Sequence, residues 1–166
     1  MKIVNIRVDE RLIHGQVAAY WTRALGANRI LVMDDFAAKD QIQKMALKMA
    51  TPAGVKLSIL TVPTAANNLK TEKYKGDNVF LIVRSPKALW EAWEEGFRFE
   101  TVNVGNMSSK FGSVQVRRTV GVTPEDVKYF RLLVEQGVKL TAQMIPNDEA
   151  VDFAPLIASD DIFGKN

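Results

Sequence analysis

Short runs of apolar, β-branched residues alternate along the whole chain with segments of helical periodicity. Strand-like runs cover residues 2–8, 29–33, 55–61, 78–83, 101–104, 113–120 and 138–144. Helical spacing predicts helices over about 17–25, 42–49, 63–70, 86–95 and 124–136, with a final helical segment over 148–159. Because strands that alternate with such helices require crossover connections, we expect an α/β fold. Its sheet should be open, mainly parallel and doubly wound, with helices on both faces.

Length and composition bound the class of protein. The 166 residues predict a single domain over 1–166, with an apolar content of 47% and a charged content of 25% that are ordinary for globular proteins. No apolar run is long enough to span a membrane, and no signal peptide follows Met1, so we expect a cytoplasmic protein. The chain has no cysteine and one histidine, which argues against a metal site, and we expect no cofactor. The small, dispersed net charge of +3 argues against nucleic-acid binding.

Polar residues and glycines gather directly after the predicted strands. In a sheet built from right-handed crossovers the carboxyl ends of the parallel strands share one edge, where ligands bind. The segments at this edge are 9–11, 34–35, 84–85, 103–106 and 145–147. The single histidine, His14, follows the first of them and opens the first predicted helix.

The residues around His14 suit phosphate chemistry, in the run Asp9-Glu10-Arg11-Leu12-Ile13-His14-Gly15-Gln16-Val17. A neutral imidazole can attack phosphorus and hold the phosphoryl group through a P–N bond. Arg11 can donate charge-assisted hydrogen bonds to that group, each worth about 1.5–3 kcal/mol. Asp9 can hold the other ring nitrogen and fix the tautomer. We therefore predict that His14 is a phosphoryl-accepting nucleophile, assisted by Arg11 and Asp9.

Further phosphate ligands are expected at the same edge. Glycine lets the backbone approach a phosphate closely, and a helix start offers free N–H groups. The residues predicted to bind phosphate are Gly15, Gln16, Arg84, Ser85, Gly105 and Asn106. Ser85 also suits a simple helix N-cap, and residues 105–106 suit a tight corner. The pair Asp34–Asp35 indicates helix capping rather than a metal site.

Other functions compete with this interpretation. His14 can be an incidental polar residue, with Asp9 and Arg11 forming a weak surface ion pair. A non-catalytic phosphate- or nucleotide-binding α/β module would use the same edge without covalent chemistry. A phosphohydrolase would need a general acid or base beyond Asp9. Histidine phosphatases carry an Arg-His-Gly turn, and Ile13 stands here in the place of that arginine.

The run from Asp9 to Val17 resembles the phosphorylation-site motif of the IIB component of the mannose/fructose/sorbose family of the bacterial phosphotransferase system. The commoner motif has aspartate where this chain has Glu10. The resemblance extends over essentially the whole chain. It includes Thr51-Pro52-Ala53-Gly54-Val55, Arg84-Ser85-Pro86, Asn103-Val104-Gly105-Asn106-Met107 and Pro146.

This resemblance implies an enzyme, a phosphohistidine–sugar phosphotransferase. It implies that His14 takes a phosphoryl group from a IIA protein and passes it to a sugar entering through the IIC and IID membrane subunits. The protein would be cytoplasmic and associated peripherally with the inner face of the plasma membrane. Met1 lies only 13 residues before His14, so we expect no fused IIA domain. The sugar and the presence of a homo-oligomer stay open.

A phosphocarrier must present its histidine to two partners in turn. We therefore expect His14 to be accessible to solvent in a loop. Arg11, Arg84, Ser85 and the turn at 105–106 should surround it, with exposed apolar residues such as Phe111 nearby.

Overall fold

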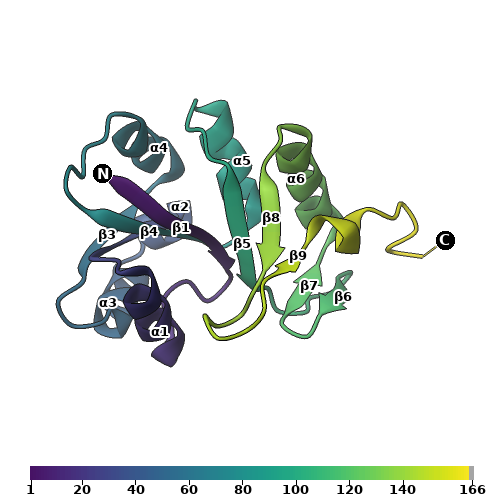
Figure 1. Ribbon diagram of the computed structural model, residues 1–166, viewed down its shortest axis with the longest axis horizontal. Helices are drawn as coiled ribbons and strands as arrows, with labels where there is room; N and C mark the ends of the chain where they lie inside the picture. Colours follow the sequence, from purple (N-terminus) through teal and green to yellow (C-terminus); the bar gives the residue numbers. More distant parts are fainter. Residues whose placement is uncertain (165–166) are drawn as a thin grey trace.

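The computed structural model describes residues 1–164 and contains a seven-stranded sheet (Figure 1). Its strands, in spatial order, are β3 (Lys56–Leu60), β2 (Arg29–Met33), β4 (Asn78–Val83), β1 (Lys2–Asp9), β5 (Thr101–Asn106), β8 (Lys139–Ala142) and β9 (Val151–Asp152). Every pairing in this sheet is parallel except that of β8 with β9. The wholly apolar run after Asn78 forms the buried strand β4, as expected for a strand covered on both faces.

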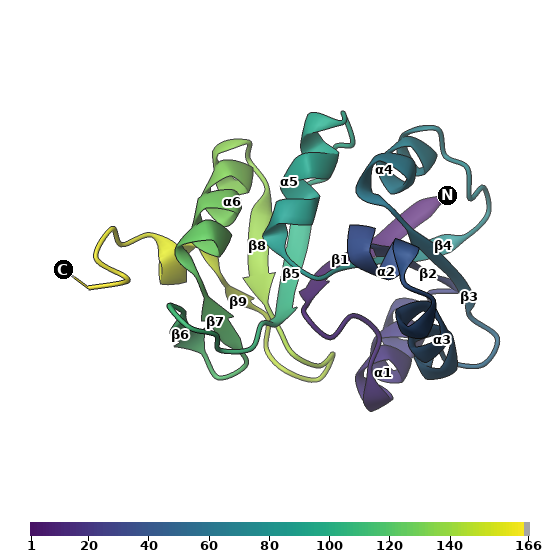
Figure 2. The ribbon, with the colours of Figure 1, turned by 180° about the vertical axis from the view of Figure 1, so that it is seen from behind.

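Helices cover both faces of the sheet (Figures 1 and 2). On one face lie α1 (Gly15–Leu25), α2 (Asp35–Lys39) and α3 (Gln41–Ala50), which contribute to one apolar cluster. On the other lie α4 (Val62–Lys70), α5 (Pro86–Glu94) and α6 (Pro124–Glu135), which contribute to the larger one. The predicted open, mainly parallel, doubly wound α/β fold is confirmed.

Local signals in the sequence account for several helix ends. Thr123 and Asp126 form a reciprocal capping box at the start of α6. The Asp34 side chain accepts a hydrogen bond from the backbone N–H of Ala37 at 2.9 Å and caps α2, which confirms the capping interpretation. Gly26 ends α1 in the left-handed conformation.

The connections of β1 and β4 place the β1–α1 loop at a distinctive point of the sheet. From β1 the chain crosses one face through α1 to reach β2, and from β4 it crosses the opposite face through α5 to reach β5. The strands β1 and β4 are neighbours, so the connections that leave their carboxyl ends diverge toward opposite faces of the sheet. Ligand sites of doubly wound sheets form at such switch points. His14 follows β1 directly at this place.

Two expected elements differ in the structure. The helical segment expected over 148–159 is wrong, because Val151 and Asp152 form β9 on the open edge of β8, followed by the 3₁₀ turn η1 (Ala154–Ile157). This pairing satisfies backbone groups of an edge strand and buries Phe153 completely. The strand expected over 113–120 is a hairpin of β6 (Val114–Arg117) and β7 (Val120–Val122), because the chain turns at residues 118–119.

Candidate functional site

His14 occupies the N-cap position of α1, and its side chain is 19% exposed. Its ring does not cap the helix. Instead, its Nε2 atom lies 3.0 Å from Oδ2 of Asp9, the last residue of β1. The side chain of His14 therefore makes no hydrogen bond to the first N–H groups of α1. The residues at this helix start, Gly15 and Gln16, are exposed.

The loop that carries His14 is fixed by its neighbours. Leu12 and Ile13 are buried in the apolar cluster beneath α1 and α3. Leu12 has the left-handed φ of 59°, and its backbone N–H donates to the carbonyl of Asp9 at 2.9 Å. A left-handed conformation is uncommon for leucine and persists only where the surroundings impose it. The buried side chains therefore hold the loop in one conformation.

Asp9 is completely buried and has three polar contacts. Its Oδ2 accepts a hydrogen bond from Nε of Arg7 at 3.2 Å and also faces His14, and its Oδ1 accepts from the backbone N–H of Arg11 at 3.0 Å. A carboxylate that accepts a hydrogen bond from Nε2 places the ring proton on that nitrogen. The unprotonated nitrogen of His14 is then Nδ1.

Arg7 also belongs to this group of side chains through its contact with Asp9, and it is not among the residues predicted from the sequence. It is buried on β1, and burial lowers the pKa of its guanidinium, while the charge of Asp9 acts in the opposite direction. Its Nη1 and Nη2 atoms donate to the carbonyls of Gln143 and Met144 at 2.9 and 3.0 Å. The spacing of Arg7 and Asp9 was a usable signal, because residues two apart on a strand share one face.

Gly105 lies directly against this guanidinium. A Cβ atom at Gly105 would lie 2.0 Å from Cζ of Arg7, so a side chain there cannot coexist with Arg7 in its present position. The ring of Trp21 covers the guanidinium on another side, with Cζ 5.2 Å from its centroid. In this structure Gly105 thus gives Arg7 the space it needs.

Arg11 and Arg84 approach the His14 loop differently. Arg11 is exposed, and its guanidinium makes no hydrogen bond to another residue among 1–164. Arg84 is half-buried and donates two hydrogen bonds of 3.2 Å to Asp34, one of 3.0 Å to Gln43, and one of 3.2 Å to the carbonyl of Glu10. The two arginines line one small pocket of about 240 Å³ on the α3 side of the loop. The guanidinium of Arg84 therefore fixes the loop in place.

The remaining predicted site residues take structural positions. Ser85 is the N-cap residue of α5 without a capping hydrogen bond from its side chain. The carbonyl of Asn106 accepts from the backbone N–H of Glu10 at 2.8 Å. The Glu10 carboxylate accepts from the backbone N–H and the hydroxyl of Ser108, at 2.6 and 2.7 Å. These contacts hold the segment 107–113, which carries the fully exposed Phe111, beside the β1–α1 loop.

Two further observations concern residues 1–164 as a set. Nowhere in them do three or more histidine, cysteine or acidic side chains come together in a way that could hold a metal ion. None of the helices formed by these residues has the length and apolar character needed to cross a membrane.

The comparison with known proteins identifies the family. Residues 3–165 match the family model described as PTS system sorbose subfamily IIB component. The chain belongs to this family of phosphotransferase-system IIB components. It is 36% identical over 165 residues to the sorbose-specific EIIB component of Lacticaseibacillus casei, and the match covers 99% of both chains. It is 33% identical to the mannose-specific EIIAB component of Escherichia coli K12, with 97% of this chain and 50% of that protein covered.

A solved structure supports the same assignment. The IIBSor domain of the sorbose permease from Klebsiella pneumoniae matches with a TM-score of 0.89 and 30% identity, over 95% of this chain and 97% of that one. The IIB function predicted from the sequence is confirmed, and a non-catalytic binding module is not favoured. This IIB component is a phosphotransferase of sugar uptake and works with IIA and membrane components of the system.

Proposed function

We propose that His14 is the residue that carries the phosphoryl group and that its Nδ1 atom forms the bond to phosphorus. The observation that carries this proposal is the 3.0 Å contact between Nε2 of His14 and the buried Asp9 carboxylate. With the ring proton held on Nε2, Nδ1 keeps a lone pair that can attack. Asp9 itself is oriented by Arg7, whose guanidinium is fixed by two backbone carbonyls.

In the first transfer the N–P bond of the donor phosphohistidine breaks and a P–N bond to His14 forms. His14 retains its proton on Nε2, so its phosphorylated ring carries a positive charge that the Asp9 carboxylate balances. Arg11 is exposed on the same loop and can donate to the phosphoryl oxygens. The N–H groups at the start of α1, at Gly15 and Gln16, supply further donors.

In the second transfer a sugar hydroxyl oxygen forms a bond to phosphorus, the P–N bond to His14 breaks, and the hydroxyl proton passes to a base outside this chain. We propose that the donor is a IIA protein and that the sugar is held by IIC and IID subunits at the inner face of the membrane. The name EIIAB of the Escherichia coli relative supports the pairing of IIA with IIB. Residues 1–166 would act as one phosphocarrier domain.

The test is phosphorylation by a purified, phosphorylated IIA protein of this family, followed by mass spectrometry under alkaline conditions that preserve P–N bonds. We expect one acid-labile phosphoryl group on His14 in the wild type and none in His14→Ala. Because Asp9 keeps its hydrogen bonds from Arg7 and from the backbone of Arg11, the variant should still fold, with a melting temperature lowered by a few degrees. An acid-stable label, or label in the variant, would contradict the proposal.

A further inference from the structure

Helix α3 presents apolar side chains to solvent on its outer side. Ile42, Met45 and Met49 are 81%, 65% and 86% exposed, and Phe36 of the adjacent α2 is 61% exposed. The spacing of the three α3 residues places them on one side of the helix. These four residues, termed here the α3 ridge, are four of the seven large apolar side chains that are exposed in residues 1–164. Such a concentration marks an interaction surface.

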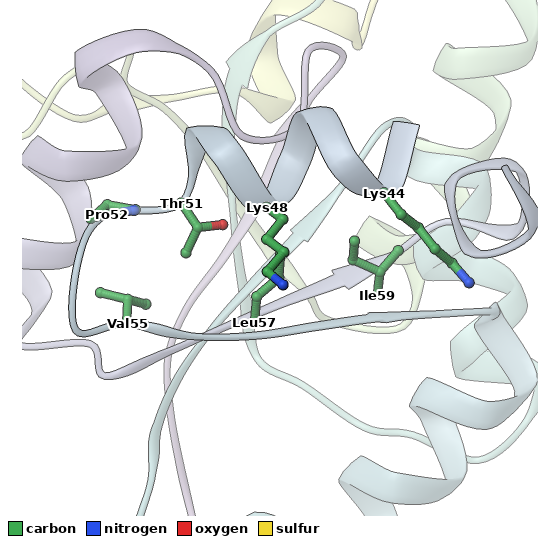
Figure 3. Close-up of a pocket in the computed structure, with 7 residues that line it drawn as sticks. All are labelled: Lys44, Lys48, Thr51, Pro52, Val55, Leu57 and Ile59. Carbon is green, nitrogen blue, oxygen red and sulfur yellow. The ribbon is translucent and has the colours of Figure 1, made fainter. Parts of the chain in front are cut away.

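The charged side chains of α3 itself are all lysines, while the carboxylates of Asp35, beside Phe36, and of Asp40, the N-cap of α3, lie at the α2 end of the ridge. The sequence has no acidic residue between Asp40 and Glu72. Lys44 and Lys48 extend from α3 over a groove of about 610 Å³ that lies between this helix and the edge strand β3 (Figure 3). Its floor includes apolar side chains of the strand and of the residues before it, Val55, Leu57 and Ile59. The ridge is thus bordered on the β3 side by lysines alone.

The other border of α3 adjoins the loop that carries His14. Gln43, Ala46 and Leu47 line the small pocket that also contains Arg11 and Arg84. Arg84 donates to Gln43 and to the carbonyl of Glu10, and so joins α3 to the β1–α1 loop directly. A protein that covers His14 from this side therefore also meets the ridge.

We propose that the α3 ridge is the surface on which the phosphorylated donor protein docks. The inference rests on the proposed function of His14 and adds the contact by which the donor is recognised. Methionine and aromatic side chains are enriched in interface cores, and methionine adapts to the partner surface. A ridge of four side chains suits the modest interface of a transient complex.

The cations at the His14 border of α3, Arg11 and Arg84, explain why the occupant is the phosphorylated donor. A phosphoryl group adds between about one and two negative charges near neutral pH. Because that group must reach His14, it lies beside Arg11 and Arg84, which bind the donor more tightly before transfer than after it. The donor is thus attracted before transfer and released after it.

The experiment compares two phosphoryl donors on the same variants. One is a phosphorylated IIA protein of this family, and the other is potassium phosphoramidate, a small P–N donor that needs no docking surface. In the double variant Ile42→Glu/Met45→Glu we expect kcat/KM with the IIA protein to fall about tenfold or more, through KM. The rate with phosphoramidate should equal that of the wild type. Glutamate favours helices, especially near their N-terminus, so α3 and the melting temperature should persist.

Two further variants sharpen the comparison. Val134→Glu changes an exposed apolar residue of α6, on the opposite face of the sheet, and should leave both rates unchanged. Lys44→Gln/Lys48→Gln should raise KM for the IIA protein and weaken its dependence on ionic strength.

Equal rates for the wild type and the ridge variant with the IIA protein would overturn the inference and leave the ridge to a membrane subunit, a lipid surface or a second copy of the chain. A ridge variant that also loses reactivity with phosphoramidate would overturn it as well, because the ridge would then act on His14 itself. A wild type in which neither donor phosphorylates His14 contradicts the proposed function and, with it, the inference.

Discussion

The space beside Arg7 allows a sharp test of how the site is held together. An alanine Cβ at position 105 would lie 2.0 Å from Cζ of Arg7 and 2.1 Å from its Nη2. Gly105 has no left-handed φ, so its backbone accepts alanine without strain. The guanidinium cannot retreat without releasing Asp9 or the carbonyls of Gln143 and Met144. Gly105→Ala should therefore displace Arg7 and, through Arg7, disturb the contact between Asp9 and His14.

The magnitude follows from two known costs. Inserting a methyl group into a packed interior costs about 1–3 kcal/mol, and breaking a buried ion pair costs about 3–5 kcal/mol. The Arg7–Asp9 pair is buried on both sides, at 1% exposure for each side chain. Because the guanidinium keeps some of its hydrogen bonds after a small shift, we expect Gly105→Ala to lower the free energy of unfolding by about 3 kcal/mol.

A double-mutant cycle in urea denaturation checks this reasoning. Arg7→Ala alone should cost about 3–5 kcal/mol, because it leaves Asp9 buried without its countercharge. In the Arg7→Ala background the added methyl of Gly105→Ala occupies vacated space. It also restricts the unfolded chain, so it should be neutral or stabilise by up to about 1 kcal/mol. The same substitution should thus destabilise the protein only where Arg7 is present.

Equal losses from Gly105→Ala in the presence and absence of Arg7 would refute the reasoning, since Arg7 would then not be the obstacle. A loss below about 0.5 kcal/mol in the wild-type background would refute it too, because that is the range of neutral surface substitutions.

Two further predictions concern the carboxylates Asp9 and Asp77. Asp9→Asn removes the charge that fixes the tautomer of His14 and balances its phosphorylated ring, so rapid-quench measurements should show phosphorylation slowed at least about a hundredfold; an unchanged rate would remove Asp9 from the mechanism. Hydrogen bonds from Lys56 and Arg29 lower the pKa of Asp77. Its stabilisation is complete above the unfolded value of about 3.9 and is lost as the pH falls through the lower folded pKa. Urea midpoints between pH 7 and pH 2 should therefore fall less for Asp77→Asn than for the wild type, and parallel curves would contradict this.

Features that are local in the sequence could be predicted from it. The alternation of strand and helix periods requires only neighbouring residues, and it gave the correct sheet class. Capping is equally local, as Asp34 and the Thr123–Asp126 box show. The position of His14 after β1 followed from the rule that parallel strands end at one edge.

Features that depend on distant main-chain atoms could not be predicted. The two carbonyl groups that fix Arg7 belong to Gln143 and Met144, and a carbonyl has no residue-specific signal. Arg84 turns toward Asp34 and Gln43, which are distant in the sequence and become its neighbours only when β2, β4 and α3 are assembled. The pattern over 148–159 predicts a helix and fails there, because the pairing of Val151 with Ala142 across the sheet edge is a tertiary interaction.

The long sequence separation between Arg7 and its carbonyl partners has a consequence for biosynthesis. The first strand leaves the ribosome well before residues 143 and 144, which follow Arg7 by 136 and 137 positions in the chain. Until they arrive, Arg7 lacks two of its acceptors, and the support beneath Asp9 and His14 is incomplete. Contacts of such long separation form late in folding, because closing the intervening loop costs entropy that only the finished sheet offsets. A nascent or truncated chain therefore cannot assemble the supported phosphorylation site, and competence to receive phosphate becomes a property of the completed fold.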